Sequence, residues 1–198
     1  MKKVLLLGDS IRMGYDDYVK ELLEGKCEVY YDAADNSRFT PYTLWQLIQM
    51  YNQYGPFDLV HWNNGYWDMS FDKTTHEPLI PVEEYAHYLR RITRILKNKG
   101  AKVVFALTTP ILTSGSAADN TGTGALNISF NDELVQKYNS VAQMIMEEER
   151  ITINDLYSLC KQDKNYFKCE DMLHLTDDGY RTCAKQISEV ILKELDIK

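Results

Sequence analysis

The chain has 198 residues, of which 44% are hydrophobic and 26% charged, and its net charge is −7. This length predicts a single domain over residues 1–198, and the plentiful apolar residues argue against intrinsic disorder. No apolar run approaches the roughly 18–20 residues that a membrane-spanning helix requires. An acidic chain without a basic stripe also disfavours nucleic acid as a partner.

The first half of the chain alternates short apolar runs with helical periodicity. Val4–Leu7 predicts a buried strand, because this run is shorter than the roughly 7–15 apolar residues of a secretory signal. We therefore expect a cytoplasmic protein, unless a leader was removed. Tyr15–Leu23 predicts a helix, Cys27–Tyr31 a second strand and Phe57–Trp62 a third. Between these last two strands, Thr40 and the proline after it predict the N-cap and first turn of another helix. Its expected buried face consists of Leu44, Leu47, Ile48 and Tyr51.

The second half continues the same alternation. Val82–Leu96 has apolar residues at helical spacing, and Lys102–Leu107 is a strand candidate rich in β-branched residues. Leu134–Ile145 predicts the next helix and Ile151–Ile153 a short fifth strand. Thr176 predicts the N-cap of the last helix, whose first turn carries two aspartates.

Strands that alternate with helices are typical of an α/β fold with a parallel sheet. Right-handed crossovers favour a doubly wound, five-stranded sheet in the order 2-1-3-4-5, with helices on both faces. The long irregular segment Pro110–Ser129 follows the fourth strand, at the edge where open α/β proteins bind ligands. It is either a lid or a passive loop.

The four cysteines do not have the pattern of a metal site, because they show neither CxxC spacing nor a paired histidine. Cys160 and Cys169 flank a polar loop. A disulfide between them is one alternative, for an oxidising compartment, and free thiols are the alternative that we favour. We expect neither a metal nor a cofactor.

Two short motifs carry candidate chemistry. Gly8-Asp9-Ser10 forms the turn after the first strand, where helix N–H groups stabilise an anion and would suit a nucleophile. The alternative is an ordinary helix cap. Asp171 precedes His174 at a spacing that lets the carboxylate hold one ring nitrogen, which leaves the other to act as a base. The alternative is a pair of solvated side chains. With strand one at the centre of the sheet, the two motifs would meet at one edge.

These motifs resemble those of the SGNH hydrolases, also called GDSL-type esterases and lipases. The resemblance is carried by residues 7–10 and by the segment from Asp171 to Tyr180, and it extends over most of the chain. It implies a flavodoxin-like, three-layer fold, with Ser10 as nucleophile, His174 as general base and Asp171 as its partner.

The resemblance also implies an oxyanion hole. The Ser10 N–H would be one donor, and Ser37 would take the place of a family glycine as the second. In the segment after the third strand, which looks like the Asn-x-Gly variant of carbohydrate-associated members, we place the side-chain donor on Asn63, with Asn64 as the alternative. Candidate substrate-binding residues near these motifs are Arg12, Arg38, Asn64, Tyr66, Trp67 and Asp68.

The favoured function is a serine esterase that removes a small acyl group, acetyl above all, from a small molecule or a carbohydrate. Lysophospholipids and thioesters are alternative substrates. A non-catalytic, flavodoxin-like protein that binds an anion or another small molecule is the alternative from a different class. The oligomeric state stays open.

Overall fold

The computed structural model describes residues 1–112, 128–168 and 171–198. Its main sheet has five strands in the order β2-β1-β3-β6-β8, and each neighbouring pair is parallel. Counted along the chain, these strands have the order 2-1-3-4-5, so the predicted fold class is confirmed. The strands are β1 (Lys2–Leu7), β2 (Cys27–Tyr30), β3 (Leu59–Trp62), β6 (Lys102–Ala106) and β8 (Thr152–Asn154).

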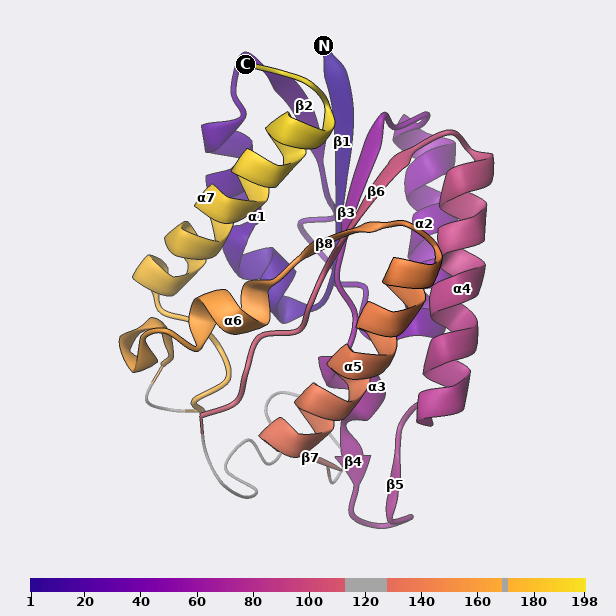
Figure 1. The fold of residues 1–198 in the computed structure, drawn as a ribbon, viewed down its shortest axis with the longest axis vertical. Coiled ribbons are helices and arrows are strands. Elements are labelled where there is room, and N and C mark those ends of the chain that lie inside the picture. The colour runs from indigo at the N-terminus through magenta and orange to yellow at the C-terminus, as the bar shows by residue number, and fades with distance from the viewer. Residues whose placement is uncertain (113–127, 169–170) are drawn as a thin grey trace.

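Helices cover both faces of this sheet (Figure 1). On one face, α1 (Ser10–Leu22) packs against α7 (Asp177–Glu194), so the first and last helices of the chain are neighbours. On the other face, α4 (Val82–Asn98) packs against both α2 (Thr40–Tyr54) and α5 (Asp132–Glu148). The result is a three-layer α/β/α arrangement with the sheet in the middle.

Several short elements lie outside the predicted alternation. In a second sheet, β4 (Phe71–Asp72) pairs antiparallel with β5 (Glu77–Pro78) and with β7 (Ile128–Ser129). This sheet lies beyond the carboxyl ends of the main strands (Figure 1). The short helices are α3 (Tyr66–Met69), α6 (Leu156–Cys160) and the 3₁₀ turn η1 (Lys164–Tyr166). Elements of this length are too short for a hydrophobic period to reveal them.

Helix α1 begins at Ser10, earlier than the predicted start at Tyr15. Asp9 caps the helix, because its Oδ1 accepts the N–H of Ile11 at 2.9 Å. Arg12 and Gly14 interrupt the apolar pattern, which is why periodicity placed the start too late. Ser10 is therefore the first residue of a capped helix.

Helix α2 is capped from a distance rather than by Thr40. Thr40 is already inside the helix, and the N-cap residue Phe39 makes no side-chain cap bond. Instead, Oδ1 of Asp68 in α3 accepts the N–H of Thr40 at 2.8 Å and its hydroxyl at 2.7 Å. This bond ties the start of α2 to the segment that follows β3.

The predicted buried face of α2 is partly wrong. Leu44 and Leu47 are buried, but Ile48 is 43% exposed. Thr43 and Gln46 are buried instead, because their polar groups have partners inside the molecule: Thr43 Oγ1 donates to Asn64, and Gln46 Oε1 accepts from Ser37. The buried side of α2 is therefore set in part by polar side chains that have hydrogen-bond partners, and not by the apolar residues alone.

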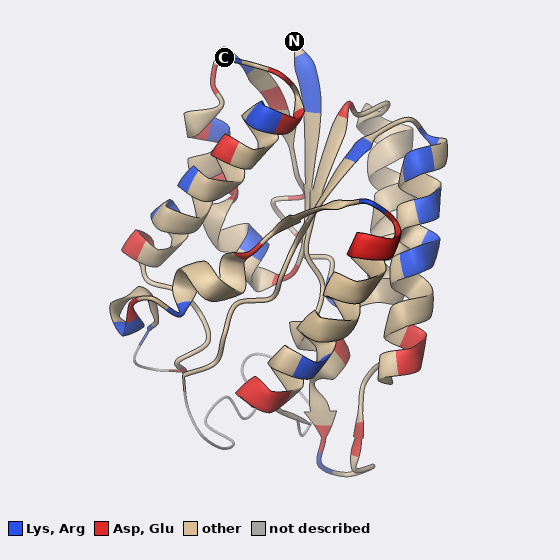
Figure 2. Cartoon of the chain, viewed as in Figure 1, with Lys and Arg blue, Asp and Glu red and all other residues tan. Residues whose placement is uncertain are grey.

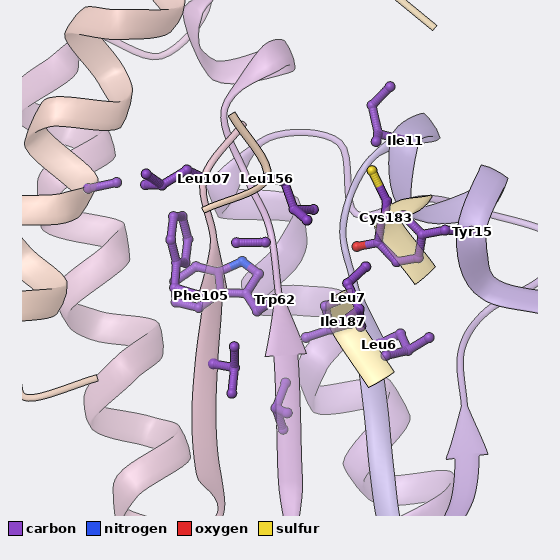
Figure 3. Packing of buried hydrophobic residues seen from close by; sticks show 14 of the residues in the cluster. Leu6, Leu7, Ile11, Tyr15, Trp62, Phe105, Leu107, Leu156, Cys183 and Ile187 are labelled. Atoms are coloured by element: carbon purple, nitrogen blue, oxygen red, sulfur yellow. The ribbon is translucent and has the colours of Figure 1, made fainter. Parts of the chain in front are cut away.

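The core lies on both sides of the main sheet (Figure 3). The fully buried rings of Trp62 and Phe105, on paired positions of β3 and β6, meet edge to face with centroids 5.0 Å apart. On the other side, Tyr15 of α1 and Ile187 of α7 are buried together with Leu6 of β1. The helices are therefore fixed to the sheet by apolar contacts, which dominate the stability of such folds.

Charged residues occur mainly on the helices and in the loops that connect the elements (Figure 2). Lys2 of β1 forms an ion pair with Asp58 just before β3, with 2.7 Å between Nζ and Oδ1. Within residues 1–112, 128–168 and 171–198, no helix combines the length and the apolar character that crossing a bilayer demands.

Cys27, Cys160 and Cys183 are buried free thiols. The Sγ atoms of Cys160 and Cys183 are 3.4 Å apart. Cys169, and with it the predicted choice between a Cys160–Cys169 disulfide and free thiols, lies outside the described residues, as does most of Pro110–Ser129 with the question of a lid.

The protein should lose stability as the pH rises, and replacing Asp68 by Asn should make this loss smaller. Burial, only partly offset by the hydrogen bonds from Thr40, raises the pKa of Asp68 to about 7. In the unfolded chain an aspartate has a pKa near about 3.9, so between about pH 4 and 7 the folded state holds the proton more tightly and stability falls as pH rises. The amide keeps the oxygen that accepts from Thr40 but does not titrate.

We expect the Tm of the unmodified protein to fall by several degrees more between about pH 5 and pH 8 than that of Asp68→Asn, measured by differential scanning calorimetry. Asp178→Asn, at an exposed position, is the control and should keep the original pH slope. Equal slopes for Asp68→Asn and the unmodified protein would contradict the assignment.

Candidate active site

Ser10 and His174 meet at the carboxyl edge of the main sheet. Ser10 follows β1 at the start of α1, and its Oγ lies 2.8 Å from Nε2 of His174. The two residues are 164 positions apart in sequence. The predicted convergence of the two motifs is therefore present in the structure, and a hydroxyl faces an imidazole at hydrogen-bonding distance.

Asp171 holds the other side of the imidazole. Its Oδ2 is 2.6 Å from Nδ1 of His174, and its Oδ1 accepts the backbone N–H groups of Leu173 and His174, both at 2.9 Å. Burial acts to raise the pKa of Asp171, but the hydrogen bonds from the His174 ring and from these two N–H groups outweigh it and lower the pKa below its usual value. The carboxylate is thus kept ionised and oriented toward the ring.

The loop that carries Asp171 and His174 is fixed on both sides. The N–H of Lys168 donates to the carbonyl of His174 at 2.8 Å, and Phe167 forms a β-bridge with Leu175. Thr176 then caps α7 by accepting the N–H of Gly179, which confirms the predicted cap. Consequently the imidazole is placed by the start of α7, as Ser10 is placed by the start of α1.

Gly14 allows these two helices to approach closely. A Cβ at this position would lie 2.2–2.6 Å from three ring atoms of Tyr180 in α7. Tyr180 is itself buried, so its ring has little room to move. The absence of a side chain at Gly14 therefore sets how near α1 lies to α7.

Two groups near Ser10 are candidates to donate a hydrogen bond to a bound molecule. In the described part of the chain, no acceptor takes the N–H of Ser10. Asn63 follows β3 beside the Gly8 turn, and its N–H bonds to the carbonyl of Leu7 at 3.0 Å. Its side-chain Nδ2 donates to Ala106 O at 3.2 Å and lies 3.5 Å from Thr108 Oγ1, whereas its buried Oδ1 has no partner among the described residues.

Ser37 is not placed as an oxyanion donor, which corrects the sequence interpretation. Its N–H already donates to the carbonyl of Gly8 at 2.7 Å. Its hydroxyl accepts the N–H of Gly8 at 2.9 Å and donates to Gln46. Ser37 therefore clamps Gly8 from both sides and supports the turn that presents Ser10.

Asn64 is also part of the scaffold. Its Nδ2 donates to the carbonyl of Arg38 at 2.9 Å, and its Oδ1 accepts from Thr43 and from the indole N–H of Trp62. It is fully buried, so it has no group left to offer a substrate. Between the two asparagines, Asn63 is the one that lies beside the Gly8–Ser10 turn.

Three further candidates for substrate binding are buried and engaged elsewhere. Tyr66 donates its hydroxyl proton to the carbonyl of Thr109 at 2.6 Å, and Asp68 caps α2. Arg12 is 1% exposed and forms an ion pair with Asp16 at 2.5 Å. These three positions are structural, because their polar groups hold neighbouring segments together.

Arg12 also positions the loop after β2. Its Nη1 donates to the carbonyl of Asp32 at 2.8 Å and its Nη2 to that of Asp35 at 2.7 Å, while Nε reaches Gly8 at 3.4 Å. One guanidinium therefore joins the Gly8–Ser10 turn to the loop that contains Ser37. The sequence around Arg12 does not reveal this role, because an arginine two residues after the serine could equally contact a substrate.

Arg38 and Trp67 are the two substrate candidates that stay partly exposed. Arg38 forms an ion pair with Asp35 at 2.7 Å, and no sequence motif pointed to Asp35. In the residues that the structure covers, no three His, Cys, Asp or Glu side chains come together in a way that could hold a metal ion.

No protein-family model matches the sequence, and no curated protein matches it. Several solved structures are similar to this chain. A lipase/acylhydrolase from Enterococcus faecalis superposes with a TM-score of 0.75 at 20% identity, over 98% of this chain and 97% of that one. The acetyl xylan esterase AlAXEase gives 0.72 at 18% identity, over 96% and 99%. Est24, a carbohydrate acetylesterase from Sinorhizobium meliloti, gives 0.69 at 13% identity, over 98% and 99%.

The chain has the SGNH/GDSL hydrolase fold. The predicted resemblance is therefore correct for the architecture, over nearly the full length of the compared chains. In this GDSL fold the Gly8 turn, the segment after β3 and the loop before α7 share one edge of the sheet, and that edge is where the hydroxyl–imidazole–carboxylate chain lies.

Replacing Gly14 by Ala should destabilise the protein. On an exposed helix the same change would stabilise by about 1 kcal/mol, because alanine is the better helix former. Here the new methyl group would overlap the Tyr180 ring, and such overpacking costs about 1–3 kcal/mol. We expect a lower free energy of unfolding in urea.

Met13→Ala, at the neighbouring exposed position of α1, should change the stability by less than about 0.5 kcal/mol. A Gly14→Ala variant as stable as the unmodified protein, or more so, would show that α1 and α7 do not require this close approach.

Proposed function

We propose that this protein is a serine esterase in which Ser10 is the nucleophile, His174 the general base and Asp171 the residue that orients the base. The observation that supports this is one continuous chain of contacts, from Oγ of Ser10 to Nε2 of His174 at 2.8 Å and from Nδ1 of His174 to Oδ2 of Asp171 at 2.6 Å. A nucleophile, a base and an orienting acid at such distances are what acyl transfer requires.

In the proposed reaction, Nε2 of His174 takes the hydroxyl proton while Oγ of Ser10 attacks the ester carbonyl. Asp171, ionised and already hydrogen-bonded to Nδ1, stabilises the imidazolium that forms. The imidazolium then protonates the departing alcohol, which leaves an acyl-enzyme. Water, deprotonated by the same imidazole, hydrolyses that intermediate and restores Ser10. The imidazole is 26% exposed, so water can reach it.

The negative oxygen of the tetrahedral intermediate needs preorganised donors. The Ser10 N–H lies at the amino end of α1, where the helix dipole also favours negative charge. The Asn63 side chain is the second donor in this proposal, because it lies beside the Gly8 turn and its 3.5 Å contact with Thr108 Oγ1 is weak enough to be exchanged for a substrate oxygen. Ser37 contributes indirectly, by fixing Gly8.

For the substrate we propose a small acyl ester, acetyl above all, carried on a carbohydrate. Support comes from two of the structural neighbours, an acetyl xylan esterase and a carbohydrate acetylesterase. A non-catalytic anion-binding protein would not need Asp171 and His174 aligned behind Ser10, so the geometry favours the enzyme.

Ser10→Ala and His174→Ala should each lower kcat/KM by about 10³-fold or more, since each removes a group that takes part in covalent chemistry. Asp171→Asn should be milder, because the ring keeps a neighbour although its tautomer is no longer enforced. The measurement is hydrolysis of p-nitrophenyl acetate, with labelling by a fluorophosphonate as a second readout.

Ser140→Ala, at an exposed serine of α5, is the control and should keep full activity and labelling. Substantial turnover by Ser10→Ala, or labelling that persists in it, would overturn the proposal.

Asn63→Ala should lower kcat by about 10²–10³-fold and leave KM nearly unchanged, because an oxyanion donor acts in the transition state. Asn64→Ala is the contrast: it breaks three buried hydrogen bonds and should lower the free energy of unfolding. Steady-state kinetics and urea unfolding of both variants separate the two roles. A larger kcat loss in a stably folded Asn64→Ala than in Asn63→Ala would reverse the assignment.

A further inference from the structure

The exposed side of α2 carries a row of large apolar side chains. Trp45 is 53% exposed and Ile48 43%, and Tyr42 is half-buried one turn before Trp45. The ring centroids of Tyr42 and Trp45 are 5.4 Å apart, with 33° between the ring planes. We call Tyr42, Trp45 and Ile48 the α2 platform.

The start of the α2 platform is held rigidly. Cζ of Arg38 lies 4.6 Å from the centroid of the Tyr42 ring, so the guanidinium covers one face of it. The Tyr42 hydroxyl donates to Oδ2 of Asp35 at 2.5 Å, and Asp35 in turn pairs with Arg38. This triangle of contacts fixes the Tyr42 ring beside Trp45, so a ligand would lose little side-chain entropy on binding there.

The platform continues from the candidate active site. Arg38 directly follows Ser37, which bonds to both backbone groups of Gly8, and Gly8 is two residues before the nucleophile. The carbonyl of Arg38 is held by Asn64 at the end of β3. Arg38 therefore connects the Gly8–Ser10 turn to the first turn of α2, where its guanidinium lies against the Tyr42 ring.

The surface of α2 is uncharged. None of its 15 residues is Asp, Glu, Lys or Arg, although 26% of the whole chain is charged. Figure 2 shows this helix without blue or red, behind the strongly charged α4. Beyond the platform, its exposed side chains are the amides of Gln49, Asn52 and Gln53 and the Tyr54 ring. Aromatic faces next to neutral amides match a ligand with C–H faces and many hydroxyl groups.

We propose that the α2 platform binds the saccharide part of the ester substrate, with a pyranose ring stacked on Trp45 and its hydroxyl groups near Asp35 and Arg38. This inference rests on the proposed esterase function and specifies where the alcohol part of the substrate lies. A lipid surface fits less well, because interfacial helices carry Lys or Arg on their polar face and α2 has none. A second copy of the chain would need roughly 20–30 contact residues, far more than this row supplies.

The kinetic test compares two acetate esters whose alcohol parts have very different lengths, and each variant is compared with the unmodified protein on both. Ethyl acetate has an alcohol too small to extend to Trp45, whereas O-acetylated xylotetraose covers several ring lengths. Trp45→Ala should lower the ratio of kcat/KM for the xylotetraose ester to that for ethyl acetate by about two- to tenfold, in KM rather than kcat. Trp45→Phe, which keeps a ring, should restore most of the ratio.

Met144→Ala is the matched control, since Met144 is 48% exposed on α5 and should leave the ratio unchanged. A ratio unaffected by Trp45→Ala, or an equal loss with both esters, would overturn the platform. Absence of activity toward both esters in the unmodified protein would instead overturn the esterase proposal.

A binding readout tests the platform independently of catalysis. In Ser10→Ala, xylotetraose should quench tryptophan fluorescence saturably, because Trp45 is 53% exposed, whereas Trp67 is only partly exposed and Trp62 is fully buried. The change should be lost on adding Trp45→Phe. No saturable change, or one that persists without Trp45, refutes the proposal whether or not esters are cleaved. Sedimentation velocity gives the remaining outcome: a dimer that Trp45→Ala converts to monomers would assign this face to a second copy instead.

Discussion

The close packing of α1 against α7 is the constraint on which the rest of the site depends. Ser10 begins one helix and His174 lies two residues before the N-cap of the other, so their contact at 2.8 Å requires both helices to lie side by side on the same face of the sheet. The sheet order makes this feasible, because β1 is in the interior of the sheet and its helix faces the returning end of the chain. The side chain missing at Gly14 determines the final separation.

A second level of organisation lies beneath the reactive groups. Ser37, Asn64 and Arg12 are buried, and each joins segments that meet at the carboxyl edge of the sheet. Burying polar groups is costly unless they are paired, and these are paired almost throughout. Asp9 shows this cost, because its burial raises its pKa to about 6. Such a network specifies one loop arrangement, and that precision is what a catalytic edge requires.

Much of the architecture could be predicted from the sequence, because it depends on patterns that extend over many residues. These are apolar runs such as Val4–Leu7, the helical spacing of apolar residues, and the handedness of crossovers. Ser10, Asp171 and His174 could be placed because turns at strand ends converge on one edge. Short elements such as α3 could not be predicted. The exposure of Ile48 on α2 could not be predicted either, because the buried side of α2 depends on which polar side chains find hydrogen-bond partners in the protein interior. Ser37 and Arg12 were misread for the same reason: sequence distance says nothing of whether an N–H faces solvent or a neighbouring carbonyl.

The fit between Gly14 and Tyr180 has an evolutionary consequence. A hydrogen atom at one position and a phenol ring at the other occupy a single shared space between two helices, so neither residue can be exchanged freely on its own. Among homologues, lineages that acquire a side chain at position 14 should have a smaller residue at position 180. The two positions should therefore co-vary across an alignment, although neither is part of the reacting groups.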